Sequence, residues 1–323
     1  MTDLNNVEYI ASLTNDAVPL DAHDAIVVTD IEQVHQGMDD TVVYNTTWPE
    51  DVSVPLTLQL YRGRITYWQV EDDHKAEREW AVLRRLRFDP FPVPRPLAQG
   101  EIQNQPYIIW RTPIGQAWSM GKDKRIDQMK QVIPQMASFL VQLHSLNHKG
   151  LNNEPLYQAT VAGTLVRMLL WSRQMGNEDL RAVIARLKPA VAQLKSWRPS
   201  LLHGDLNIDK VVTRHGEILA FTGWEQAAIG DPRWDVMTTA HSLRSLDVNL
   251  AEQFVNWYET FSGKTIEDRA FWWAMISVRL WAIKAWAHYA IDAKVIDTNL
   301  NNWAKDVDVI RVQAFADLES ARL

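Results

Sequence analysis

The chain of 323 residues contains no cysteine. This absence excludes disulfide bonds, a thiolate nucleophile and any metal site built on thiolates. Basic clusters are scarce as well, because no run of Lys and Arg is longer than Arg84-Arg85 and its neighbours, and the net charge is -7. Binding of nucleic acid needs a basic face, so we expect no nucleic-acid partner.

Long apolar runs without charge are also missing. The segment from Phe271 to Ile291 is about long enough to cross a bilayer. However, Arg279 and Lys284 lie in its middle, and each would cost roughly 2.5 to 3.5 kcal/mol at a bilayer centre. A buried helix is therefore predicted there, with no membrane partner. The residues 1–6 lack the basic and apolar regions of a signal peptide, which predicts a cytoplasmic protein.

The pattern of apolar residues changes along the chain. About the first hundred residues alternate short β-branched runs with turns, whereas the pattern after Asp127 is almost wholly helical. Together with a hydrophobic content of 46%, this predicts an α+β protein with a substantial core. We expect strands at 25–30, 41–47, 55–61 and 107–110, and helices at 72–86, 131–146, 161–173, 177–196, 250–260, 267–292 and 300–322.

One stretch carries most of the chemical information. It combines His-Gly-Asp with Trp-Glu and Gly-Asp-Pro motifs further on, at 203–205, 224–225 and 230–232, together with Ala227 and Asp235. The spacing resembles the catalytic loop of the aminoglycoside phosphotransferase and choline kinase family, whose pattern is H-G-D-x-x-x-x-N and then I-D-W-E-x-A-x-x-G-D-P-x-x-D. The resemblance covers roughly residues 34–258.

The resemblance implies a bilobal, protein-kinase-like fold. Its N-lobe would be a small antiparallel sheet on the nucleotide side, residues 1–112. Its C-lobe would be helical and carry the catalytic loop and acceptor pocket, residues 113–323. The catalytic base would be Asp205, and the residues on the nucleotide side would be Gln59, Glu79, Trp110 and Thr112. Asp205 and Gly223 would face each other across the cleft between the lobes.

The metal positions depart from the family pattern. Phosphoryl transfer relies on Mg²⁺, which requires oxygen ligands. Here Lys210 stands at the position of the Asn, and Gly223 at that of the Asp. We therefore expect no metal and no cofactor. One interpretation makes Lys210 a tethered cation paired with Asp205, and the other directs it into solvent.

The phosphate positions depart as well. Gln59 stands where the family has the lysine that contacts the ATP phosphates, so Glu79 loses its ionic partner. In the phosphate-covering hairpin, which starts at Gly37, Asp39 and Asp40 add two carboxylates that would oppose ATP binding. The alternative is that both are solvated turn residues, since Asp is common in turns.

Fifteen tryptophans are the remaining anomaly. Aromatic walls suit a quaternary ammonium or a flat ligand. At helical spacing such residues also form cores, and both interpretations stay open. The residues concerned are Trp257, Trp272, Trp273, Trp281, Trp286 and Trp303.

The leading hypothesis is a kinase-like protein impaired in Mg-ATP phosphotransfer, a pseudokinase that binds a small molecule in the interlobe or acceptor pocket. A rival keeps an active phosphotransferase that moves the γ-phosphate of ATP to a hydroxyl or amine. In it, Asn207 or Asp209 would be a displaced Mg²⁺ ligand and Lys210 a phosphate clamp. A third hypothesis is a scaffold with a protein partner.

Overall fold

The structure is a computed structural model that describes residues 4–18, 26–35, 39–49, 52–62, 72–88, 90–115, 122–151, 154–294 and 306–323. Two compact units emerge from its contacts. The first comprises Met1–Ile65, Val70–Ala117 and Val211–Glu225, and the second Thr66–Gln69, Trp118–Lys210 and Gln226–Leu323. The lobe boundary at residue 113 stays a prediction. Gly37 and Trp303, which the sequence singled out, lie outside the described residues.

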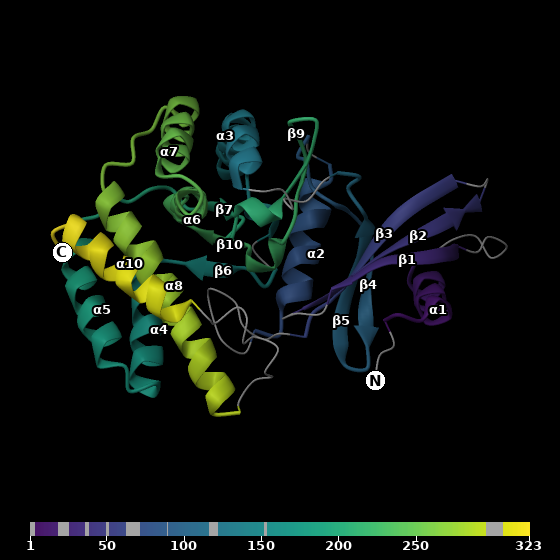
Figure 1. The fold of residues 1–323 in the computed structure, drawn as a ribbon, viewed down its shortest axis with the longest axis horizontal. Coiled ribbons are helices and arrows are strands. Elements are labelled where there is room, and N and C mark those ends of the chain that lie inside the picture. The colour runs from purple at the N-terminus through teal and green to yellow at the C-terminus, as the bar shows by residue number, and fades with distance from the viewer. Residues whose placement is uncertain are drawn as a thin grey trace. The chain divides into compact units, whose positions relative to one another are not determined.

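The first unit is built on an antiparallel sheet of five strands in the order β1-β2-β3-β5-β4 (Figure 1). The strands expected from the alternating pattern are present, and β4 is an addition. Their bounds are β1 Val27–His35, β2 Asp40–Trp48, β3 Val52–Leu60, β4 Arg95–Ile102 and β5 Gln105–Arg111. A separate hairpin of the same unit joins β8 Val211–Arg214 to β9 Glu217–Phe221.

Two helices cover opposite faces of this sheet. Along β5, Tyr107 and Ile109 join the core that includes α1 (Val7–Ala17), whereas Ile108 and Trp110 pack with α2 (Lys75–Leu86). This alternation is the period of two that a strand covered on both faces must show. The sequence predicted α2 at 72–86, but it gave no prediction of α1.

The second unit is mainly helical. Three of its helices begin after a residue whose side-chain oxygen accepts a backbone N–H, which satisfies one of the unpaired amides at a helix start: Thr160, Asn177 and Asp247. A small sheet in the order β6-β10-β7 lies among the helices. The elements are α3 Lys122–Ser145, β6 Tyr157–Ala159, α4 Val161–Gln174, α5 Glu178–Val191, β7 Ser200–Leu202, β10 Ala228–Gly230, α6 Arg233–Arg244, α7 Val248–Ser262, α8 Arg269–Asp292 and α10 Val307–Ser320.

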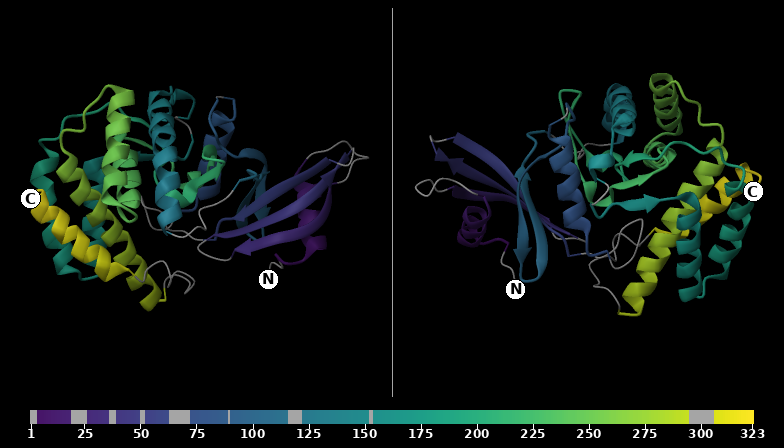
Figure 2. Two further views of the ribbon diagram at one scale, coloured as in Figure 1. Left: turned by 45° about the horizontal axis from the view of Figure 1, so that its top comes forward. Right: turned by 180° about the vertical axis from the view of Figure 1, so that it is seen from behind.

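The long apolar segment forms α8, which α10 crosses (Figure 2). Arg279 is fully buried in α8 and donates from Nη2 to the hydroxyl of Thr238, 3.0 Å away. The predicted buried helix is thus confirmed. Within the described residues, no helix is long and apolar enough to cross a membrane.

The tryptophans of the C-terminal helices are mostly core residues. Trp272, Trp281 and Trp286 are buried, and Trp272 meets the ring of Trp234 edge-on at 5.1 Å. Trp257 is different, because it is exposed and stacks on Phe261. The interpretation as core is confirmed for the three buried side chains.

The sequence-based fold class is confirmed. An N-terminal antiparallel sheet precedes a helical C-terminal part, so the protein is mixed α+β. The change from period two to helical spacing predicted this division correctly.

Candidate functional site

The His-Gly-Asp motif follows directly on strand β7 in the second unit. Gly204 has φ +87°, a left-handed conformation that favours glycine. A Cβ built on Gly204 would lie 2.0 Å from the carbonyl oxygen of Gln226. The loop therefore requires glycine at this position, for both backbone conformation and space.

Asp235, in the first turn of α6, holds this loop in place. Its carboxylate accepts the backbone N–H groups of His203 at 2.7 Å and of Gly204 at 2.8 Å. Nε2 of His144 lies 3.2 Å from the same carboxylate, while its Nδ1 lies 2.9 Å from the hydroxyl of Tyr258. Asp235 therefore braces the backbone of the His-Gly-Asp loop, and His144 is a member of the network that sequence reasoning did not assign.

Asp205, the predicted base, is buried, with 8% of its surface exposed. Nδ2 of Asn207 donates to its Oδ1 at 3.3 Å, and Oδ1 of Asn207 accepts the backbone N–H of Asp209 at 2.9 Å. The side-chain amide of Asn207 thus links Asp205 to the backbone at Asp209. Asp209 is exposed and Lys210 half-buried in the short helix η3 (Ile208–Lys210).

The predicted pair between the Lys210 ammonium and Asp205 stays a prediction. The backbone N–H of Lys210 donates to the carbonyl of Asn207 at 3.1 Å. Over the described residues, no group of three or more His, Cys, Asp or Glu side chains is arranged to hold a metal ion. Asn207 and Asp209 as displaced metal ligands also stay a prediction.

In the first unit, Gly223 has φ +79° and precedes η4 (Trp224–Gln226). Trp224 is fully buried, and its indole N–H donates to the carbonyl of Phe221 at 2.8 Å. The backbone N–H of Trp224 donates to Oε1 of Glu79 at 3.2 Å. The segment after Gly223 is therefore tied to helix α2.

Glu79 has partners other than the residue at position 59. Its Oε2 accepts the hydroxyl of Tyr61 at 2.7 Å, and its Oε1 accepts the N–H of Trp224. Burial, and then the Glu79 carboxylate, raise the pKa of Tyr61 well above its usual range, so the phenol remains a donor. Gln59 is half-buried on β3, opposite Ile108 of β5.

A buried ion pair in α2 strengthens the same region. Arg78 pairs with Asp72 through two contacts of 2.9 and 3.0 Å, and its Nη1 also donates to the carbonyl of Glu225. Both side chains are almost fully buried. The segment around η4 is therefore bound to α2 by two residues, Glu79 through the N–H of Trp224 and Arg78 through the carbonyl of Glu225.

Asp39 and Asp40 both have basic partners. Asp39 pairs with the ammonium of Lys75 and accepts the backbone N–H of Arg62 at 3.0 Å, while Asp40 pairs with the Arg62 guanidinium at 2.8 Å. The interpretation as solvated turn residues is wrong, because the side chains of Asp39 and Asp40 are only 14% and 2% exposed. Strand pairing and the placement of α2 bring these cations to them.

The other two residues predicted on the nucleotide side are held within the first unit. Trp110 is buried against α2 in the cluster with Tyr61 and Ile108. The hydroxyl of Thr112 lies 2.8 Å from that of Thr57 on β3. Their role toward a nucleotide stays a prediction.

Lys75 and Tyr61 are the residues at this site that the sequence did not single out. Lys75 lies four residues before Glu79, so the two share one face of α2, a spacing that could have drawn attention to it. Lys75 and Asp39 are 36 residues apart in the sequence, so no local pattern indicated that the two would pair.

The braced His-Gly-Asp loop, the five-stranded sheet and helix α2 with its buried Glu79 are the features of a kinase-like phosphotransferase fold. The chain belongs to the phosphotransferase enzyme family, whose model matches residues 30–272.

Solved structures of antibiotic phosphotransferases share the fold. A thermostable mutant of aminoglycoside phosphotransferase APH(4)-Ia, in complex with ADP and hygromycin B, matches with a TM-score of 0.63 and 14% identity, covering 91% of this chain and 95% of that one. Spectinomycin phosphotransferase APH(9)-Ia, with ADP and spectinomycin, gives 0.63 and 11%, covering 97% and 98%. The macrolide 2'-phosphotransferase MphH from Brachybacterium faecium gives 0.61 and 17%, covering 93% and 97%.

Curated relatives match only in part. Acyl-CoA dehydrogenase family member 10 of Mus musculus is 25% identical over 186 residues, which is 50% of this chain and 16% of that protein. Member 11 of Homo sapiens is 26% identical over 187 residues, 50% of this chain and 22% of that protein. The chain thus matches less than a quarter of the length of these relatives.

Proposed function

We propose that this chain is a phosphotransferase-family protein impaired in standard Mg-ATP phosphotransfer, which binds a small molecule in the manner of a pseudokinase. The observation that carries the proposal is the pairing of Glu79. In the family pattern this glutamate would pair with a lysine at position 59, but here it accepts Tyr61 and Trp224, and position 59 is Gln59. A neutral amide cannot offset the charge of a polyphosphate.

The positions of the metal ligands support the same proposal. Lys210 and Gly223 stand where the family pattern has Asn and Asp. An ammonium repels Mg²⁺, and glycine has no side-chain ligand. If each lost electrostatic contribution costs roughly 2.7 to 4 kcal/mol, three losses could reduce the rate by ~10⁶-fold or more, with strong non-additivity. Neither Mg²⁺ nor ATP is then expected as a resident cofactor.

Calorimetry with ATP, with and without Mg²⁺, tests the proposal. We expect no Mg²⁺-dependent affinity tighter than about millimolar, which corresponds to roughly 4 kcal/mol. Micromolar binding that disappears with a chelator would contradict it. A thermal-shift titration with ATP and Mg²⁺, each alone and together, gives a second measurement on the same protein.

A second candidate function is an active, atypical phosphotransferase. It is favoured by the catalytic loop, in which Asp205 is retained and Asp235 braces His203 and Gly204. Two of the similar solved structures contain ADP and an antibiotic, which supports a small molecule with a hydroxyl or amine as acceptor. Loss of the γ-phosphate of ATP that depends on an added acceptor, and that Asp205→Ala abolishes, would establish this activity in place of the first proposal.

A further inference from the structure

Two donors of the first unit converge on one carboxylate. The ammonium of Lys75 and the backbone N–H of Arg62 both bind Asp39, through Oδ2 and Oδ1 respectively. An ammonium and a backbone N–H are also the groups that proteins use to bind phosphate. The Lys75 ammonium and the Arg62 N–H therefore form an anion-binding site, and the carboxylate of Asp39 occupies it.

The strand register places this anion site on the face that carries position 59. Thr41 lies opposite Gln59, and Asp40 lies opposite Leu60. Because side chains alternate along a strand, Asp39 belongs to the face of Gln59 and Tyr61. On that face the Lys75 ammonium lies 5.9 Å from the centre of the Tyr61 ring.

Burial explains why Lys75 requires an anion. Its side chain is only 2% exposed, and an ammonium so buried is strongly unfavourable without an opposite charge. Asp39 is 14% exposed, so it forms the solvent side of the pair. An anion that arrives from solvent would thus meet Asp39 first and Lys75 behind it.

We propose that Lys75 is the phosphate-binding cation of this protein, replacing the lysine absent at position 59, and that Asp39 occupies its phosphate site until a nucleotide phosphate displaces it. The inference rests on the proposed function for one point, that Gln59 stands where the family pattern has the lysine that contacts the phosphates. It adds Lys75 as the residue that would contact the phosphates, and Asp39 as the residue that competes with the phosphates for Lys75.

The experiment measures binding of ADP and of inorganic tripolyphosphate to the full chain by calorimetry in EDTA. Asp39→Asn removes the competing charge, and we expect it to increase the affinity for both probes at least tenfold over the wild type. Lys75→Met in the Asp39→Asn background should abolish that increase. The control Asp30→Asn makes the same change in net charge at an exposed position of β1 and should leave affinity unchanged.

An affinity unchanged by Asp39→Asn, or an increase that persists without Lys75, would overturn the inference. If Asp39→Asn does not fold, Asp39→Ser keeps an oxygen for the Lys75 ammonium and takes its place. As a second readout, tripolyphosphate should raise the Tm of the Asp39 variant more than that of the wild type. An equal or smaller rise would count against the site.

The outcome is separable from that of the proposed function. Micromolar, Mg²⁺-dependent ATP binding by the wild type would contradict the proposed function, but the comparison of variants in EDTA would still decide the role of Lys75. Conversely, unchanged affinity of the Asp39 and Lys75 variants in EDTA would overturn the role of Lys75. It would not alter the result of the wild-type calorimetry with ATP and Mg²⁺, which tests the proposed function.

Discussion

At the scale of single residues, the buried carboxylate of Glu79 is satisfied by two hydrogen-bond donors. Glu79 keeps a buried position although position 59 is neutral, because Tyr61 and Trp224 donate hydrogen bonds to it. A buried carboxylate without donors would be strongly unfavourable, so these two donors allow the glutamate to stay buried.

The first prediction follows from this partnership. Tyr61→Phe removes the donor to Oε2 of Glu79 and should lower the free energy of unfolding by about 1 to 3 kcal/mol, since the acceptor is buried and charged. Urea denaturation measures the change. The comparison is Tyr44→Phe, which removes the 2.9 Å contact between the Tyr44 and Thr14 hydroxyls, a neutral pair. Tyr61→Phe should be the more costly of the two, and equal losses would argue against a charged Glu79.

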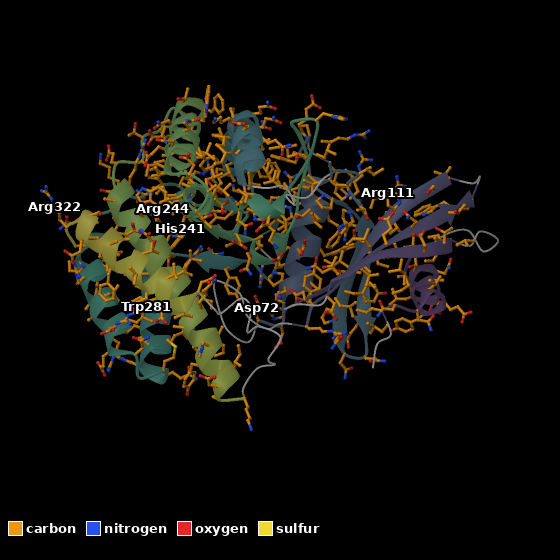
Figure 3. The ribbon with its side chains drawn as sticks, in the orientation of Figure 1. Asp72, Arg111, His241, Arg244, Trp281 and Arg322 are labelled. Atoms are coloured by element: carbon orange, nitrogen blue, oxygen red, sulfur yellow. The ribbon has the colours of Figure 1, made fainter. Side chains whose placement is uncertain are left out.

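A second prediction at this scale concerns pH. His241 is buried on α6, and burial, followed by the nearby charge of Arg244, lowers its pKa to about 4. Arg279 of α8 lowers it further and Asp317 of α10 raises it. His241, Arg244 and Trp281 are labelled in Figure 3. The imidazole is therefore neutral in the folded protein at pH values where an unfolded chain, with its ordinary pKa near 6.5, would bind a proton.

The sign of the pH effect follows from this difference. The folded pKa is depressed, so the contribution of His241 to stability is fully present above pH 6.5 and is lost as pH falls toward 4, by about 3 kcal/mol in total. Urea denaturation at several pH values should show that His241→Gln is less sensitive to acid than the wild type in this window. Identical pH profiles for the two proteins would contradict the prediction. Groups such as Asp317 titrate in both proteins and cancel in the comparison.

At the scale of elements, backbone geometry determines the His-Gly-Asp loop. Gly204→Ala should lower the free energy of unfolding by at least about 1 to 3 kcal/mol, because its left-handed φ strains an L-residue and the Cβ would collide with Gln226. Gly150→Ala is the matched control, since a Cβ there meets nothing within 4 Å. Thermal and chemical denaturation of both variants measure the difference. A similar stability for the two would show that the loop can rearrange.

The elements themselves were largely predictable. Short β-branched runs between turns predicted β2 and β3, and helical spacing predicted α2 and α4, because these patterns are local in the sequence. Helix α1 was missed, although Asn6 caps it by accepting the N–H of Tyr9 at 3.1 Å. The buried residues Ile10, Leu13 and Thr14 of α1 recur at helical spacing, so the signal was present in the sequence but was not used.

At the scale of the whole molecule, the proposed function predicts that phosphotransfer groups can be supplied by substituting the three positions together. The triple variant Gln59→Lys, Lys210→Asn and Gly223→Asp should acquire Mg²⁺-dependent binding of ATP, measured by calorimetry, because it regains a phosphate contact and two oxygen ligands. The φ of +79° at Gly223 is a cost of roughly 1 to 2 kcal/mol for an L-residue, so a lower Tm is expected as well.

The control for this variant replaces Lys210 and Gly223 with alanine while keeping Gln59→Lys. This control also removes the side chain of Lys210 and changes Gly223, but it supplies no oxygen ligands. Its binding of ATP should therefore not depend on Mg²⁺. If the triple variant and this control bind ATP alike, the family positions are not where this protein would hold a metal.

The sequence by itself determined the family, the α+β class and the loop at 203–205, because these depend on local motifs and on the periodicity of apolar residues. It also predicted that Gln59, Lys210 and Gly223 depart from the family pattern, and this stays a prediction. The tertiary structure decided which charges meet. Asp39 and Lys75 are 36 residues apart, and Glu79 and Trp224 are 145 apart. Such pairs depend on strand register and on the seating of a helix, which no local pattern encodes.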